Sequence, residues 1–198
     1  MQKRKKASKK LEAKFFRKKG RKDMNIIMLG AQGTGKTTLL PYVDGFWPIT
    51  GVVRNLNKNG NKINTQGTGE SQQNIFDEYC KVFRDTSHIP FRVSDRSLID
   101  VVAYTKYLYD NGRADEITFG DQLIMTKRWF EQHPNTVVCY FPIEFEVVGD
   151  GLRSVDEDYR KTIDENIRWI LNELKLDYYI IEGSLEERID LIRAIAEF

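Results

Sequence analysis

The residues with the clearest chemistry lie in one short glycine-rich segment. Residues 30–37 read Gly-Ala-Gln-Gly-Thr-Gly-Lys-Thr, which matches the pattern G-x-x-x-x-G-K-[ST] without departure. Glycines let backbone amides approach a phosphate, while the lysine spans the β- and γ-phosphates and the final hydroxyl ligates Mg²⁺. The motif therefore predicts a loop that binds ATP and Mg²⁺. The predicted contacts are Gly30, Gly33, Thr34, Gly35, Lys36, Thr37 and Thr38, with Lys36 catalytic and Thr37 a metal ligand.

A second candidate pair, Asp95 and Arg96, directly follows the short run 91–94. This run reads as a strand, and phosphates bind at the carboxyl edge of parallel sheets. Asp95 can hold Mg²⁺ through water or accept a proton from an acceptor hydroxyl, and Arg96 can neutralise the transferred phosphate. The alternative is that Asp95 only caps a helix that begins near Ser97. With a phosphate-binding loop upstream, we favour the catalytic role for both residues.

Weaker candidates lie elsewhere in the chain. Arg153 and Arg160 flank an acidic segment after the strand at 136–141, where arginines can close over the γ-phosphate and stabilise charge in the transition state. Equally, they can pair with neighbouring aspartates on a solvated face. Arg54 and Gln72 are candidates for binding the acceptor.

Strands that alternate with helices must position these side chains. Helical periodicity predicts helices, and the alternation predicts an α/β fold with a parallel sheet of about five strands, flanked by helices. Residues 44–70 are rich in Gly, Asn and Thr and are predicted to be loop. Strands are expected at 24–29, 91–94, 136–141 and 178–181, and helices at 36–40, 72–83, 98–108, 121–132, 159–174 and 184–196.

Charge is distributed very unevenly along the 198 residues. Residues 1–22 carry twelve Lys and Arg against Glu12 alone, a net charge of +11, which leaves −9 for residues 23–198. We therefore predict a flexible basic tail over residues 1–23 and one domain over residues 24–198. The tail can be an arm that binds nucleic acid or another anionic surface, or a merely solvated extension.

The cysteine content and hydropathy indicate the compartment. Two cysteines exclude a disulfide framework, and no apolar run approaches the roughly 18 residues needed to cross a bilayer. A signal peptide is also missing from the N-terminus. These observations predict a cytoplasmic protein without membrane contact.

Taken together, the motifs resemble the small P-loop kinases. The resemblance rests on the Walker loop, on Asp95-Arg96-Ser97 continuing through 98–104, on Gly151-Leu152-Arg153 with Tyr159-Arg160, and on the ending 178–188. Within these kinases the chain is similar to the NadR-like group, an ATPase domain related to ribosylnicotinamide kinase that phages also encode. Deoxynucleoside and thymidylate kinases share an acid followed by Arg at this point, although the first group usually has Glu where Asp95 stands.

The resemblance implies a nucleoside or nucleotide kinase fold and an ATP- and Mg²⁺-dependent phosphotransferase. The expected acceptor is a small nucleoside-like molecule or a nucleotide. A polynucleotide kinase anchored by the basic tail is one alternative, and a nucleotide-controlled binding module without transfer activity is another. Switch and guanine-reading motifs are missing, which argues against a regulatory GTPase.

Overall fold

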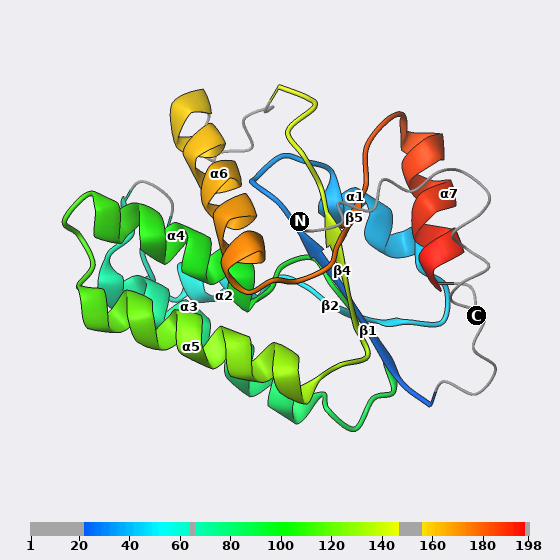
Figure 1. The fold of residues 1–198 in the computed structure, drawn as a ribbon, viewed down its shortest axis with the longest axis horizontal. Coiled ribbons are helices and arrows are strands. Elements are labelled where there is room, and N and C mark those ends of the chain that lie inside the picture. The colour runs from blue at the N-terminus through cyan, green and yellow to red at the C-terminus, as the bar shows by residue number, and fades with distance from the viewer. Residues whose placement is uncertain (1–21, 64–65, 147–155, 197–198) are drawn as a thin grey trace.

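The computed structural model describes residues 22–63, 66–146 and 156–196, and a five-stranded parallel sheet forms the centre of this part of the chain. The strand order is β2-β3-β1-β4-β5, with β1 in the middle (Figure 1). This confirms the predicted α/β fold and parallel sheet. The strands are β1 Met24–Leu29, β2 Trp47–Ile49, β3 Phe91–Ser94, β4 Thr136–Tyr140 and β5 Tyr179–Ile180.

Helices cover both faces of this sheet. Figure 1 shows α4, α5 and α6 on one side and α1 and α7 on the other. The helices are α1 Lys36–Leu39, the 3₁₀ turn η2 Leu40–Tyr42, α2 Val52–Lys58, α3 Gly69–Asp85, α4 Leu98–Asp110, α5 Glu116–Gln132, α6 Glu157–Glu173 and α7 Leu185–Ala196.

The central strand shows why the core has two halves. Successive side chains of a strand point to opposite faces. Accordingly, Ile27 and Leu29 pack into the cluster beneath α3, α4 and α6, whereas Ile26 and Met28 pack into the cluster beneath α1 and α7. An apolar strand buried on both faces is therefore fixed at the centre of the sheet, and the loop that follows it starts at the middle of the carboxyl edge.

The prediction that residues 44–70 are loop is wrong. They contain the edge strand β2 and the helix α2, which begins after Gly51 in the left-handed conformation with φ 78°. Strand β2 has only three residues, and of these only Ile49 is buried. It is a strand because it pairs with β3, an interaction over long sequence separation that local composition does not reveal.

Side-chain caps set several helix starts. Thr68 and Ser71 form a capping box at α3, so that helix begins three residues before the predicted Gln72. Asp115 caps α5, which also starts earlier than predicted, at Glu116. A capping box also opens α7, since the Ser184 amide donates to Glu187 Oε2 over 3.1 Å and the Glu187 amide donates back to Ser184 Oγ over 3.3 Å.

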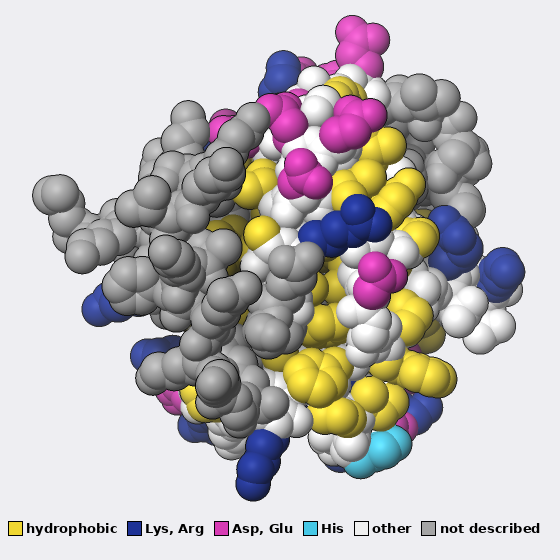
Figure 2. Space-filling view, turned by 90° about the vertical axis from the view of Figure 1, so that its right-hand side faces the viewer, with side chains coloured by type: hydrophobic (Ala, Val, Ile, Leu, Met, Phe, Trp, Pro, Cys, Tyr) yellow, Lys and Arg dark blue, Asp and Glu magenta, His cyan; other side chains and the backbone are white. Residues whose placement is uncertain are grey.

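The face formed by α7 is chemically divided. Figure 2 shows acidic side chains gathered at its upper end, where α7 begins, and hydrophobic side chains lower down. Glu186 and Glu187 lie in the first turn of α7, where carboxylates interact favourably with the helix dipole.

Across residues 22–63, 66–146 and 156–196, no helix is long and apolar enough to span a membrane. The predicted tail, apart from Lys22 and Asp23, lies outside these residues.

Candidate functional site

The glycine-rich segment forms a loop between β1 and α1, at the centre of the carboxyl edge of the sheet. Gly30 has φ +151°, and a Cβ there would lie 2.4 Å from the carbonyl oxygen of Phe141. Gly35 has φ +85°, a left-handed conformation that disfavours other residues, at the N-cap of α1. Two of the predicted glycines are therefore required by the backbone itself, one by close approach and one by conformation.

Lys36 lies inside this loop rather than on its surface. Its side chain is buried, with 6% of the residue exposed. The ammonium donates to the carbonyl oxygens of Gly30 and Ala31 over 2.6 and 2.7 Å, and to Thr34 Oγ1 over 3.0 Å. Three oxygens thus hold the cation at the loop, and phosphate oxygens would take the place of some of them when a nucleotide binds.

Asp95 follows β3, the strand beside β1. Its Oδ2 accepts hydrogen bonds from the Thr37 hydroxyl over 3.0 Å and from the Thr50 hydroxyl over 2.8 Å. The helix α4 is capped by Ser97, whose hydroxyl accepts from the Ile99 amide over 3.1 Å. Asp95 is therefore not the helix cap that the alternative interpretation required.

The pair formed by Thr37 and Asp95 fits a magnesium ion. Mg²⁺ prefers oxygen ligands and is usually held by one or two protein groups together with waters and substrate phosphates. Among the described residues there is no group of three or more His, Cys, Asp or Glu that could hold a metal alone. Thr37 as a direct ligand and Asp95 through water would supply the protein's share, and the nucleotide would supply the rest.

A small pocket is lined by Arg96, the residue that follows Asp95. Gln72 of α3 and Arg96 line it with Asp100 and Tyr104 of α4, and its remaining walls are apolar, formed by Val53, Ile63, Ile75 and Val101. The Arg96 guanidinium lies over the Tyr104 ring, 5.5 Å from its centroid. The volume is about 30 Å³, which is room for a water molecule rather than a nucleoside, so the walls must separate to admit a larger ligand.

Asp100 is a site residue that the sequence interpretation missed. It is 1% exposed, and Oδ2 accepts from the Ser97 amide over 2.7 Å. Burial raises the pKa of this carboxyl, and the nearby cations Lys36 and Arg96 oppose the rise. The spacing Ser97-x-x-Asp100 resembles a capping box, so the sequence signal points to a helix start and not to a pocket.

The remaining predicted residues are distributed unevenly. Arg160 is buried against the loop, where Nε donates to the Gln32 carbonyl over 2.9 Å, and its Nη2 has no hydrogen-bond partner within the described part of the chain. Its ion pair is with Glu157, not with the aspartates considered from the sequence. Arg54 is exposed on α2 and does not line the pocket, Thr38 is exposed on α1, and Arg153 lies outside the described residues.

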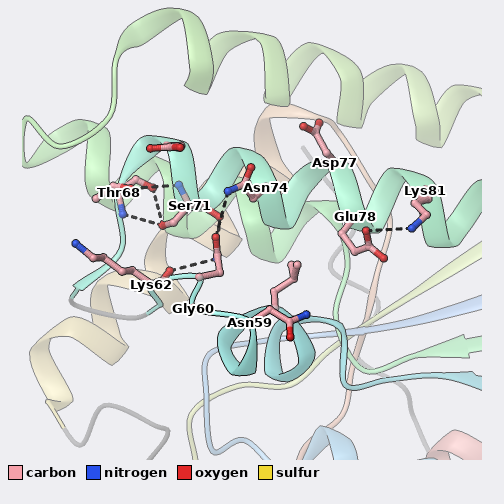
Figure 3. Close-up of a pocket in the computed structure, with 12 residues that line it drawn as sticks. Asn59, Gly60, Lys62, Thr68, Ser71, Asn74, Asp77, Glu78 and Lys81 are labelled. Carbon is pink, nitrogen blue, oxygen red and sulfur yellow. Dashed lines mark hydrogen bonds and ion pairs between the residues drawn. The ribbon is translucent and has the colours of Figure 1, made fainter.

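A larger cavity lies away from this site, between the end of α2 and the outer face of α3 (Figure 3). Its volume is about 660 Å³, and its walls are mostly exposed amides and charges, including Asn59, Asn74 and the ion pair of Glu78 with Lys81. No residue of the phosphate loop lines it. The loop does not line the small pocket either, but Arg96 does, and the preceding residue Asp95 contacts Thr37 of the loop. This link to the loop distinguishes the small pocket from the larger cavity.

Comparison with solved structures shows that the fold is shared with P-loop kinases. A deoxyadenosine kinase from M. mycoides, solved with dCMP and dCDP, superposes with a TM-score of 0.57 at 16% identity, over 86% of this chain and 97% of that chain. The NadR protein, solved with NAD and AMP-PNP, superposes with a TM-score of 0.67 at 15% identity, over 89% of this chain and 49% of that chain. This chain thus spans about half of the NadR chain.

The family follows from the sequence match. Residues 25–188 match the model of the AAA_28 family, described as an AAA domain, and the chain belongs to that family. A search of the curated proteins by sequence finds no match. The predicted likeness to the NadR-like and deoxynucleoside kinases is confirmed at the level of the fold.

Proposed function

We propose that the protein is a Mg²⁺-dependent kinase that transfers the γ-phosphoryl group of ATP to a hydroxyl of a nucleoside-like acceptor. The observation that carries the proposal is the position of Asp95 and Arg96, because the first contacts Thr37 of the phosphate loop and the second lines the small pocket. The phosphoryl donor at the loop and the acceptor in the pocket would therefore meet near Asp95.

The pocket walls favour a neutral acceptor over a phosphorylated one. A phosphate monoester carries between about −1.5 and −2 charge at neutral pH and calls for several unpaired cations. Among the described residues that line this pocket, Arg96 is the one cation, and it interacts electrostatically with the Asp100 carboxyl of the same pocket. The amide of Gln72 among apolar walls suits a ring that bears both hydrogen-bond donors and acceptors. Two structural neighbours support this class, since one is a deoxyadenosine kinase and the other, NadR, was solved with NR.

Catalysis in this site would come from positioning and charge. Lys36 and the loop amides would hold the phosphates, and bound Mg²⁺ would neutralise charge that develops between the β- and γ-phosphates. Asp95 would orient the metal through Thr37, or accept the proton of the acceptor hydroxyl. Its two hydrogen bonds, both to hydroxyls at the metal side, favour the metal role.

A transfer screen tests the proposal. Labelled ATP and Mg²⁺ are incubated with nucleosides, nucleoside monophosphates and oligonucleotides, with Lys36→Met as the inactive control. We expect transfer to at least one nucleoside, with a kcat/KM well above that for its monophosphate. Absence of transfer to every acceptor contradicts the kinase assignment, and a preference for monophosphates contradicts the acceptor assignment.

The variant Asp95→Asn separates the two roles of Asp95. If the carboxylate orients Mg²⁺, excess Mg²⁺ restores part of the lost rate and the pH profile stays flat. If it is the base, a loss of about 10²–10⁴-fold resists Mg²⁺ and the residual rate climbs with pH. We expect the first result, and the second would assign proton transfer to Asp95.

A further inference from the structure

Arg188, in the last helix α7, is buried behind the phosphate loop. It is 2% exposed although it is an arginine. Its Nη1 donates to the Thr34 carbonyl over 2.8 Å, and its Nε donates to the Gly183 carbonyl over 2.9 Å. Its Nη2 pairs with the Glu144 carboxylate. One side chain thus joins the loop to the residues after β4 and to the turn before α7.

Arg160 holds the same loop from α6. Its Nε donates to the Gln32 carbonyl over 2.9 Å, and its Nη1 donates to the Phe145 carbonyl over 2.7 Å. The Phe145 ring in turn lies 4.6 Å from the Arg188 guanidinium. The two arginines therefore share an anchor, residues 144–145, while each contacts a different peptide of the loop.

The two carbonyl contacts determine the direction in which the following glycine amides point. In a planar trans peptide the C=O and the following N–H point in opposite directions. Because the Thr34 carbonyl points at Arg188, the Gly35 amide points away from it; because the Gln32 carbonyl points at Arg160, the Gly33 amide points away from that side chain. Neither glycine amide donates a hydrogen bond to another group in the described residues.

We infer that Arg188 and Arg160 are positioning residues that hold the phosphate loop in its binding shape from behind, each fixing the peptide plane of one phosphate-binding amide. Arg188 orients the amide of Gly35, and Arg160 orients that of Gly33. Amides that already point in the binding direction need no reorganisation of the backbone when an anion binds. The inference rests on the proposed function only in taking a nucleotide phosphate as the ligand.

The test measures ADP binding to the full chain and follows the two glycine amides by ¹H–¹⁵N NMR. The variants are Arg188→Met and Arg160→Met, with Arg193→Met as the matched control, because Arg193 lies exposed on the same helix, with its guanidinium over the Tyr42 ring. We expect Arg188→Met to weaken ADP binding about 10- to 100-fold, the cost of one charge-assisted hydrogen bond to phosphate.

The amide signals distinguish positioning from general stability. In the wild-type protein both glycine amide resonances should shift when ADP binds. Arg188→Met should lose mainly the Gly35 shift, Arg160→Met mainly the Gly33 shift, and Arg193→Met neither. If Arg188→Met does not fold, Arg188→Lys keeps the charge beside Glu144 and replaces it in the series.

Several results would overturn the inference. One is wild-type ADP affinity together with an unchanged Gly35 shift in the Arg188 variant. Another is an equal loss of both shifts in both variants in proportion to their melting temperatures, since that is the signature of a structural role alone. A protein that binds ADP but phosphorylates no acceptor contradicts the proposed function and leaves this test intact, whereas one that binds no ADP contradicts both.

Discussion

Replacing Gly30 by alanine tests how the first glycine of the loop is constrained. The added Cβ would lie 2.4 Å from the Phe141 carbonyl oxygen, far inside the roughly 3.5 Å at which heavy atoms meet favourably. That oxygen belongs to the backbone beside β4, where the Phe141 amide donates to the Leu29 carbonyl over 2.8 Å. The clash therefore cannot be relieved by rotating a side chain, and β1 and β4 must separate at their ends.

The expected loss in the free energy of unfolding is the sum of two costs. Overpacking of a rigid site costs about 1–3 kcal/mol, and an alanine at positive φ costs about 1–2 kcal/mol. Gly30→Ala should therefore lower the free energy of unfolding by about 2–5 kcal/mol. Gly45→Ala is the matched control, because Gly45 has φ +80° but nothing lies within 4 Å of the added Cβ. It should lose only the backbone cost, about 1–2 kcal/mol.

Urea unfolding followed by circular dichroism measures both values, and ADP titration reports the effect on the loop. Because the clash displaces the first residue of the phosphate loop, Gly30→Ala should also weaken ADP binding, whereas Gly45→Ala should not. Equal destabilisation of the two variants would show that the contact with Phe141 is not limiting, and the reasoning would fail.

Three further outcomes are expected. Lys36→Met should abolish phosphoryl transfer and lower the melting temperature, because three loop oxygens lose their donor; unchanged turnover would refute this. Burial raises the pKa of the Asp100 carboxyl in the folded protein. The stability that this group contributes is therefore fully present below about pH 3.9, the pKa of an aspartate in the unfolded chain, and is lost as the pH rises through the folded pKa. The stability of Asp100→Asn relative to wild type, from urea titrations, should therefore improve from pH 4 towards neutrality, and a constant difference contradicts it. Finally, a thiol reagent should label the half-buried Cys80 in the native protein but reach the buried Cys139 only after unfolding.

Local patterns were sufficient for much of this protein. The eight-residue motif, the apolar run before it and the acid after residues 91–94 predicted the phosphate loop, the central strand and Asp95 at the carboxyl edge. These features are readable because each depends on neighbours in sequence: glycines for a tight backbone, a short apolar run for a buried strand, and an acid at a strand end. Helix periodicity likewise located the amphipathic helix α6, whose buried side chains recur at helical spacing.

Tertiary structure decided what those patterns left open. The short edge strand β2 exists because β3 offers it a partner, and Thr50 reaches Asp95 because the two strands end side by side. Arg160 was a candidate either for the γ-phosphate or for an ion pair with aspartates, and the structure places it against the loop backbone, which Arg188 reaches from the last helix. Contacts across more than a hundred residues leave no periodic or spacing signal. The sequence by itself therefore predicted the phosphate loop from its local motif, while only the packing of α6 and α7 against the loop decided which arginines contact its backbone.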